Sequence, residues 1–229
     1  MMEGMEGPVP VGGHWIWRDR HHDTQILFAG RGPDRSDERD AVLQRIAPGA
    51  PPVAWAKQIH SARVLPALPG ACGEGDALVG EMGLALSVVT ADCVPVVLAG
   101  PGGLAAVHAG WRGIAARIVA ATLDQLDGPL TQWTAWIGPA IGPCCYEVGE
   151  DVAEQVAAVS GPEVILPAVH PGQRPHLDVT AAVRRQLEDA GVRDVRVISH
   201  CTLCDGERLW SYRRDGKGAG RNLAFIWRG

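Results

Sequence analysis

The chain has 229 residues, of which 46% are hydrophobic and 21% charged, and its formal net charge is -5. This composition can bury a sizeable core and excludes a disordered chain, and an acidic balance without a basic stripe argues against a nucleic-acid-binding protein. No apolar run reaches the ~18 residues of a transmembrane helix, and the N-terminus lacks the pattern of a signal peptide, so we expect a cytoplasmic protein that contacts no membrane.

The first third of the chain predicts strands around a single helix. Residues 1–23 are poorly patterned, with many glycines and prolines, and they predict no element. A charged loop leads into a predicted helix over residues 38–47, for which Ser36 or Asp37 would be the N-cap. Apolar or alternating runs predict strands over residues 24–30, 51–68 and 72–80.

Strands and helices are mixed through the rest of the chain. Residues 113–126 place apolar side chains at helical spacing, which predicts a helix that packs on a sheet. A helix over residues 181–190 would have Asp178 or Thr180 as its N-cap and would end at Gly191. Because no linker or repeat divides the chain, we expect a single α/β or α+β domain. Another helix is predicted over residues 150–160, strands over 83–93, 94–100, 103–110, 131–138, 162–169 and 192–200, and a basic loop with a last strand over 211–229.

Three residues with metal-binding side chains lie where predicted strands end: His60, Cys93 and His108. Two imidazoles and a thiolate with a fourth position open are typical of catalytic zinc. Their separations of 33 and 15 residues match no short ligand motif, so spacing alone also allows buried structural side chains. Arg112 follows in a glycine-rich stretch that opens the predicted helix. A cation there opposes the helix dipole unless an anion is bound, so Arg112 is either an anion contact or a solvated side chain.

The six cysteines are expected to be thiols, because the chain shows no secretion signal. They are Cys72, Cys93, Cys144, Cys145, Cys201 and Cys204. The last two form a C-x-x-C pair that resembles half of a zinc knuckle. No second C-x-x-C or H-x-x-x-H completes the knuckle, so structural or incidental thiols are the stronger interpretation.

Six segments in order resemble the multicopper polyphenol oxidase, or laccase-like, family, whose members are understood as purine nucleoside phosphorylases. They are KQIHSARV, GDALV, TADCVPVVL, VHAGWRG, IGPAIGPCCYEVG and SYRRDGKGAGRNLAFI, from Lys57 to Ile226. The resemblance implies a single domain over residues 1–229, folded as a four-layer α/β/β/α sandwich with mixed sheets. It also implies Zn²⁺ held by the histidine of QIH, the cysteine of ADC and the histidine of HAGWRG, which are His60, Cys93 and His108.

The activities that the resemblance implies are phosphorolysis of adenosine, inosine and methylthioadenosine, and deamination of adenosine. Purine nucleosides and phosphate are then the expected partners, with Cys93 and Arg112 as catalytic residues and the protein a monomer or homodimer. Substrate-binding candidates are Arg31, Arg112, Cys145 and Arg213, with Arg214 and Arg221 further candidates in the basic tail. The family's N-terminal Gly-Gly-Val-Ser turn and Asn-Leu-Gly segment are missing here, which puts substrate specificity in question.

Other classes of protein remain open from the sequence. Cys93 as a nucleophile with His108 as its base would make a thiol hydrolase or amidase. A polyphenol oxidase would bind Cu²⁺, although the eight histidines include no His-x-His pair, so a trinuclear copper centre is not expected. A metallochaperone or interaction domain would keep the zinc site and turn over no nucleoside.

Overall fold

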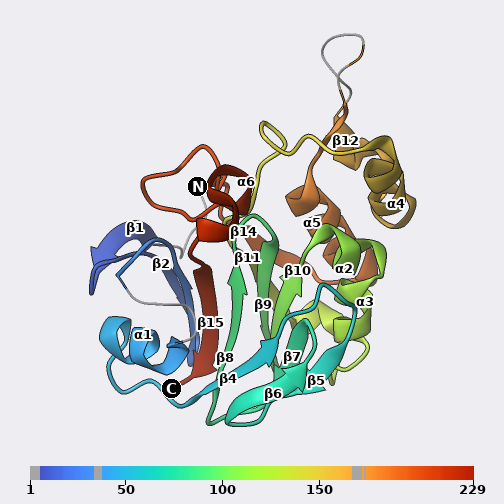
Figure 1. Ribbon diagram of the computed structural model, residues 1–229. Helices are drawn as coiled ribbons and strands as arrows, with labels where there is room; N and C mark the ends of the chain where they lie inside the picture. The colour runs from blue at the N-terminus through green and yellow to red at the C-terminus, as the bar shows by residue number, and fades with distance from the viewer. Residues whose placement is uncertain (1–5, 34–37, 167–171, 173) are drawn as a thin grey trace.

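Two mixed sheets lie face to face in the computed structural model, which describes residues 6–33, 38–166, 172 and 174–229 (Figure 1). In the described residues, the larger sheet has the order β1 (Glu6–Val11), β2 (His14–His21), β3 (Thr24–Ala29), β15 (Asn222–Arg228), β8 (Ala85–Thr90), β4 (Val53–Lys57), β6 (Gly70–Glu74). The smaller sheet has the order β14 (Asp194–Val197), β11 (Thr134–Ile137), β9 (Val94–Gly100), β10 (Gly103–Ala109), β7 (Ala77–Gly80), β5 (Val64–Pro66). The C-terminal strand β15 therefore lies inside the sheet that the N-terminal strands begin.

Strand β9, in the middle of the smaller sheet, is apolar throughout because both of its faces are buried. In β9, Val97 faces the larger sheet, where it packs in one cluster with Phe28 and Leu86. Its neighbours Val96 and Leu98 point the other way, into the cluster that the helices cover. Successive side chains of a strand alternate between faces, so a strand buried on both sides appears as a continuous apolar run rather than an alternating one.

Helices cover the outer faces of both sheets and complete four layers (Figure 1). Val42 and Leu43 of α1 (Arg39–Ile46) pack on the larger sheet against Leu27 and Phe225. The smaller sheet is covered by α2 (Trp111–Ala115), α3 (Ile118–Leu123), α4 (Glu150–Ser160) and α5 (Val179–Ala190). The expected α/β/β/α sandwich is therefore confirmed. None of the helices in the described residues is long and apolar enough to span a membrane.

The N-terminal segment is more ordered than its composition predicts. Although residues 1–23 predict no element, β1 and β2 form there and pair antiparallel. The prediction was wrong because β2 is stabilised by burial on both faces: Ile16 packs in the cluster with α1 and Trp17 in the cluster between the sheets, despite the glycines and prolines nearby. Ser36 and Asp37, the candidate N-caps, lie outside the described residues, and α1 begins after Glu38 without a side-chain cap.

The single helix predicted over residues 113–126 is two short helices. The first, α2, already begins at Trp111 and ends at Ala115, and Arg117 then adopts a left-handed conformation with φ of 63°. That conformation interrupts the helical hydrogen bonds before α3 starts. Apolar spacing did not reveal the break because the buried side chains Ile114 and Ile118 on either side of it still pack into one cluster.

The short elements differ in extent from the predictions. Residues 51–68 form β4 and β5, and only two residues of the strand predicted over 162–169 are in a strand, while residues 167–169 lie outside the described part of the chain. Those two residues make β12 (Ile165–Leu166), which pairs with β13 (His176–Leu177). The basic tail contains α6 (Tyr212–Asp215) before β15.

The Asp178→Ala variant is expected to lose about 1 kcal/mol of unfolding free energy, the usual effect of removing an N-cap. Asp178 rather than Thr180 caps α5, since its Oδ1 accepts a 2.8 Å hydrogen bond from the Ala181 backbone N–H. Urea denaturation followed by circular dichroism measures the loss, with Thr180→Ala as the matched control. Equal losses in both variants would contradict this assignment. The predicted end at Gly191 is confirmed, with φ of 109°.

Candidate functional site

The structure brings His60, Cys93 and His108 together at one end of the sandwich. His60 follows β4, Cys93 lies in the turn between β8 and β9, and His108 is near the end of β10. One ligand atom of each lies within 4.8 Å of the others, and Cys93 Sγ is 3.9 Å from His60 Nε2. The group is possible despite its sequence separation because β4 and β8 are neighbours in one sheet while β9 and β10 are neighbours in the other.

A buried carboxylate, Asp76, fixes the positions of both histidines. Its Oδ1 accepts a 2.8 Å hydrogen bond from His108 Nδ1 and a 2.9 Å bond from the His60 backbone N–H. Its Oδ2 accepts from the backbone N–H groups of Ile59 and Ser61, at 3.3 and 2.6 Å, and from Ser61 Oγ at 2.7 Å. With Nδ1 engaged, the other ring nitrogen of His108 is left to face a ligand. The backbone bonds also hold His60 at φ of 60°, which is uncommon for a residue with a side chain.

The electrostatics of the group favour a thiolate beside charged partners. Burial by itself raises the pKa of Cys93, but its contacts with His108 and His60 outweigh burial and lower that pKa to about 6. Burial likewise lowers the pKa of His108, while Asp76 and Cys93 together raise it to about 9. The pKa of Asp76 lies well below its usual range, because the bonds from His108 and Ser61 overcome burial. An anionic thiol and carboxylate therefore surround the histidines, and a cation would complement them.

Gly110 gives the three side chains room to meet. A Cβ at this position would lie 3.0 Å from His60 Cδ2 and 3.1 Å from Cys93 Sγ. Any larger residue would push these two side chains apart. Gly110 therefore has a steric role in the site, because it leaves space for His60 and Cys93.

The group lines a cavity of about 770 Å³. This volume is within the ~300–1,000 Å³ range of sites for small molecules. The cavity combines basic and aromatic side chains, as a site for an anion and a flat ring would. Among them are Arg39, Lys57, Tyr146, Tyr212, Arg213 and Arg221.

Comparisons with known proteins show the family of the chain. A family profile described as multi-copper polyphenol oxidoreductase laccase matches residues 33–229. The chain belongs to this family. It is 36% identical over 178 residues to a purine nucleoside phosphorylase of Pseudomonas aeruginosa, covering 76% of this chain and 73% of that one.

Solved structures with the same fold include the following two. A Neisseria meningitidis protein has a TM-score of 0.78 and 29% sequence identity, covering 94% of this chain and 99% of that chain. A hypothetical protein of Bacillus licheniformis, YfiH, has a TM-score of 0.86 and 22% identity over 100% of both chains. This chain therefore has the same mixed α/β fold as these two solved structures.

The family's descriptive name refers to copper, and the donor groups present can be compared with it. Among the described residues, two groups of three or more His, Cys, Asp or Glu side chains are close enough to hold one ion. One is His60, Cys93 and His108, and the other consists of four cysteines. A multicopper cluster needs more imidazoles than either group offers. In this family member the first group is thus a possible site for a single metal ion.

Of the substrate-binding candidates, Arg221 and Arg213 line the cavity, and Arg213 is held there by several contacts. Its backbone N–H donates a 2.7 Å hydrogen bond to Asp92 Oδ2, and its guanidinium donates to the Glu147 carbonyl at 3.1 Å and lies over the Tyr146 ring. Arg112 is exposed and stacks on the neighbouring Trp111, outside the cavity lining. Its charge still acts at the cavity edge: burial raises the pKa of Tyr146 to about 12, and Arg213 and Arg112 oppose this rise.

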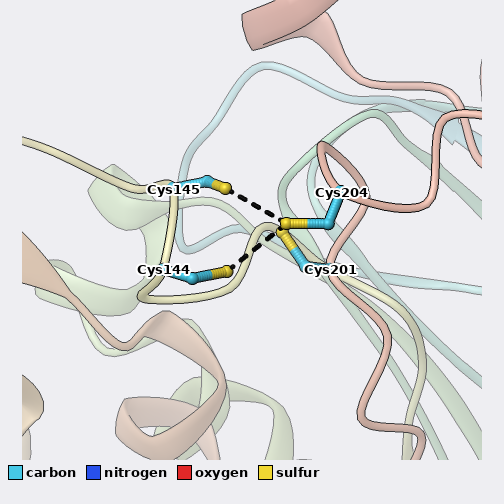
Figure 2. A group of neighbouring side chains, drawn as sticks. All are labelled: Cys144, Cys145, Cys201 and Cys204. Carbon is cyan, nitrogen blue, oxygen red and sulfur yellow. Dashed lines mark hydrogen bonds between the residues drawn. The ribbon is translucent and has the colours of Figure 1, made fainter.

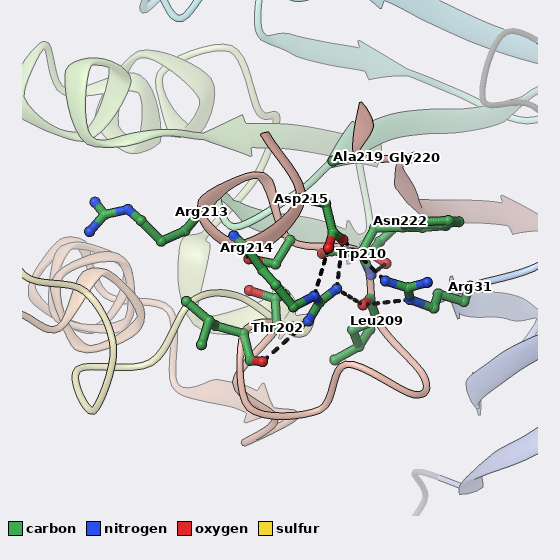
Figure 3. Close-up of polar contacts among 12 residues, drawn as sticks. Arg31, Thr202, Leu209, Trp210, Arg213, Arg214, Asp215, Ala219, Gly220 and Asn222 are labelled. Carbon is green, nitrogen blue, oxygen red and sulfur yellow. Dashed lines mark hydrogen bonds and ion pairs between the residues drawn. The ribbon is translucent and has the colours of Figure 1, made fainter. Parts of the chain in front are cut away.

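Arg31 is held in a network beside the cavity rather than inside it (Figure 3). It donates hydrogen bonds to the Leu209 carbonyl and to Asp215, both at 3.1 Å, and lies 3.9 Å over the Trp210 ring. Arg214 donates to the same Leu209 carbonyl and to Asp215. Figure 3 shows Arg213 pointing away from this network. The network holds Arg214 and Asp215, the last two residues of α6, and so helps to position Arg213 one residue before them. Cys145 also lies outside the cavity lining, in the group of four cysteines.

Sequence reasoning missed several residues that shape the site, among them Asp76, Asp92 and Tyr146. Asp92, with φ of 92°, accepts a 2.6 Å hydrogen bond from Thr202 Oγ1 as well as the bond from Arg213. Both acids could have been found by their setting, since each stands beside an apolar strand, in GDALV and in TADC. A buried acid in such a setting requires partners.

Proposed function

We propose that this chain is a zinc-dependent purine nucleoside phosphorylase. It would convert adenosine, inosine and methylthioadenosine with phosphate to the free base and ribose 1-phosphate, and it would also deaminate adenosine. The observation that carries the proposal is the His60, Cys93 and His108 group, braced by Asp76, on the wall of a cavity lined by arginines and aromatic rings. The phosphorylase name of the Pseudomonas relative supports it.

The residues present fit a zinc ion. On a tetrahedral zinc, thiolate and imidazole donors stand about 3.6 Å apart, given Zn–S and Zn–N bonds of about 2.3 and 2.05 Å. The 3.9 Å between Cys93 Sγ and His60 Nε2 is close to this spacing. The bond from His108 Nδ1 to Asp76 is the carboxylate–histidine contact that commonly orients a metal-bound imidazole. Zinc bound there would supply Lewis-acid chemistry and would lower the pKa of a water, so that its deprotonated form could attack the amine-bearing carbon of adenosine near neutral pH.

The protein's own residues would bind and orient the substrates. Tyr146 and Tyr212 offer aromatic surface for the purine. Arg213 offers a planar guanidinium that matches two phosphate oxygens, with Arg112 adding positive charge from the cavity edge. These cations would hold phosphate in position to attack the sugar. They would also stabilise the negative charge of the phosphate while the glycosidic bond breaks. Arg31 would position α6 and not contact the nucleoside.

A thiol hydrolase is the alternative that a specific observation favours. Cys93, His108 and Asp76 also follow the order of nucleophile, base and orienting carboxylate, and the pKa of Cys93 is lowered to about 6. The two functions differ in their need for metal. A copper-dependent polyphenol oxidase would differ in the identity of the metal.

The test is an assay of purified protein with inosine, with and without phosphate, resolved by liquid chromatography. We expect hypoxanthine and ribose 1-phosphate only when phosphate is present, loss of both after chelation, and recovery with Zn²⁺ but not with Cu²⁺. Adenosine would yield inosine as well as adenine. A turnover rate that does not depend on added phosphate would contradict phosphorolysis. Metal-free turnover blocked by iodoacetamide would instead identify the thiol hydrolase, and phenol oxidation restored by Cu²⁺ the oxidase.

A further inference from the structure

Four cysteines from two distant segments meet outside the cavity (Figure 2). Cys144 and Cys145 belong to the loop between β11 and α4, and Cys201 and Cys204 to the turn after β14. Their sulfur atoms all lie within 4.8 Å of one another. Cys204 Sγ is 3.7 Å from Cys144 Sγ and 3.3 Å from Cys145 Sγ. Figure 2 shows all four side chains directed toward one point.

These separations match four donors around one ion. With Zn–S bonds of about 2.3 Å in a tetrahedron, neighbouring sulfurs stand about 3.8 Å apart. A disulfide would instead bring one pair to about 2.05 Å and leave the other two sulfurs outside the bond. All four cysteines are free thiols in the structure. Four sulfurs in a tetrahedral arrangement are a donor set typical of zinc.

The backbone around the sulfurs is arranged as in a ligand site. The Gly142 backbone N–H donates to Cys201 Sγ at 3.2 Å, a contact that stabilises a thiolate. Each pair lies in its own tight turn, closed by Cys145 N–H to the Gly142 carbonyl and by Asp205 N–H to the Cys201 carbonyl. A Cβ on Gly142 would lie 3.2 Å from Cys144 Sγ and 3.5 Å from Cys201 Sγ. Glycine therefore permits the close approach of the two turns.

We propose that Cys144, Cys145, Cys201 and Cys204 bind one structural Zn²⁺, separate from the His60, Cys93 and His108 site. Binding replaces the thiol protons, which are released to solvent, and involves no change in oxidation state. The C-x-x-C pair thus has a second half after all. That half is a pair of adjacent cysteines, a spacing that the usual zinc-knuckle pattern does not contain.

The ion would hold together two loops that build the cavity. Tyr146, which lines the cavity, directly follows Cys145. Thr202 directly follows Cys201, and its hydroxyl donates to Asp92, which in turn accepts from the Arg213 backbone. A zinc ion between the loops would therefore fix the cavity wall without touching the substrate.

Metal analysis of purified protein, prepared without chelators, tests the proposal. We expect two zinc ions per chain in the wild type and one in Cys204→Ser. The control Cys72→Ser changes a thiol outside the group and should keep two. His60→Ala removes a ligand of the other site and should also keep one. A wild type with one zinc that Cys204→Ser loses and His60→Ala keeps would support this site while contradicting the zinc of the proposed function.

A measurement on the wild type keeps the proposal testable if Cys204→Ser does not fold. Cys144 and Cys204 are exposed, so a mercurial reagent can reach them in the native protein. We expect one equivalent of zinc to be released in step with their modification, detected with a chromophoric chelator. Release of no zinc, iron in place of zinc, or a disulfide linking the two loops in non-reducing peptide maps would each overturn the proposal.

Discussion

Asp76→Asn is expected to weaken metal binding at the His60, Cys93 and His108 site by roughly 10- to 100-fold, the usual effect of losing a carboxylate that orients a ligand. Phosphorolysis should fall with it. Asp76 accepts bonds from His108 Nδ1, from Ser61 Oγ and from three backbone N–H groups. An asparagine has one acceptor oxygen and an NH₂ group that would face these donors, so the His60 loop and the His108 ring would both lose their positions.

Asp19→Asn is the matched control, because Asp19 is also a buried carboxylate with several donors. Its Oδ2 accepts from Trp136 Nε1 and from Arg196, both at 2.8 Å, away from the site. Both variants should lose stability in urea denaturation, but only Asp76→Asn should require more free zinc for half-maximal activity. If added zinc leaves the two variants equally active relative to wild type, Asp76 has a structural role alone.

Patterns local in sequence predicted much of the fold. Apolar runs identified β9 and β10 because strands buried on both faces need no polar positions, and Asp178 with Gly191 marked both ends of α5. Features that depend on tertiary contacts were missed. Strand β2 contains charged residues, and one of them, Asp19, is buried only because Trp136 and Arg196 reach it from the other sheet.

In the site, too, local sequence patterns predicted some residues, and residues that depend on tertiary contacts were missed. His60, Cys93 and His108 were found because their residue types stand at strand ends and because the chain resembles a known family. The role of Asp76 depends on donors 15 to 17 residues away in a loop and 32 residues away in β10, a relation that no short motif contains. Arg213 is fixed by Asp92 across 121 residues, whereas Arg112 drew attention through its local position at a helix start.

Arg213→Gln is expected to raise the KM for phosphate by roughly 10- to 100-fold at saturating inosine. A hydrogen bond to a charged group contributes about 1.5–3 kcal/mol, which corresponds to this range. Glutamine keeps the backbone bond to Asp92 and much of the packing on Tyr146, but it lacks the charge and the planar fork. The KM for inosine should change less, because the purine is held by aromatic surface.

Two other arginines make this prediction specific. Arg112→Gln should raise the KM for phosphate by a smaller factor, because Arg112 is exposed on Trp111 and reaches the cavity only through its charge. Arg18→Gln, an exposed position on β2 paired with Glu6, should leave it unchanged. Since the effect of a distant charge is screened by salt, the Arg112→Gln effect should shrink as ionic strength rises, while that of Arg213→Gln persists. A larger effect at Arg112 than at Arg213 would instead place phosphate at the start of α2.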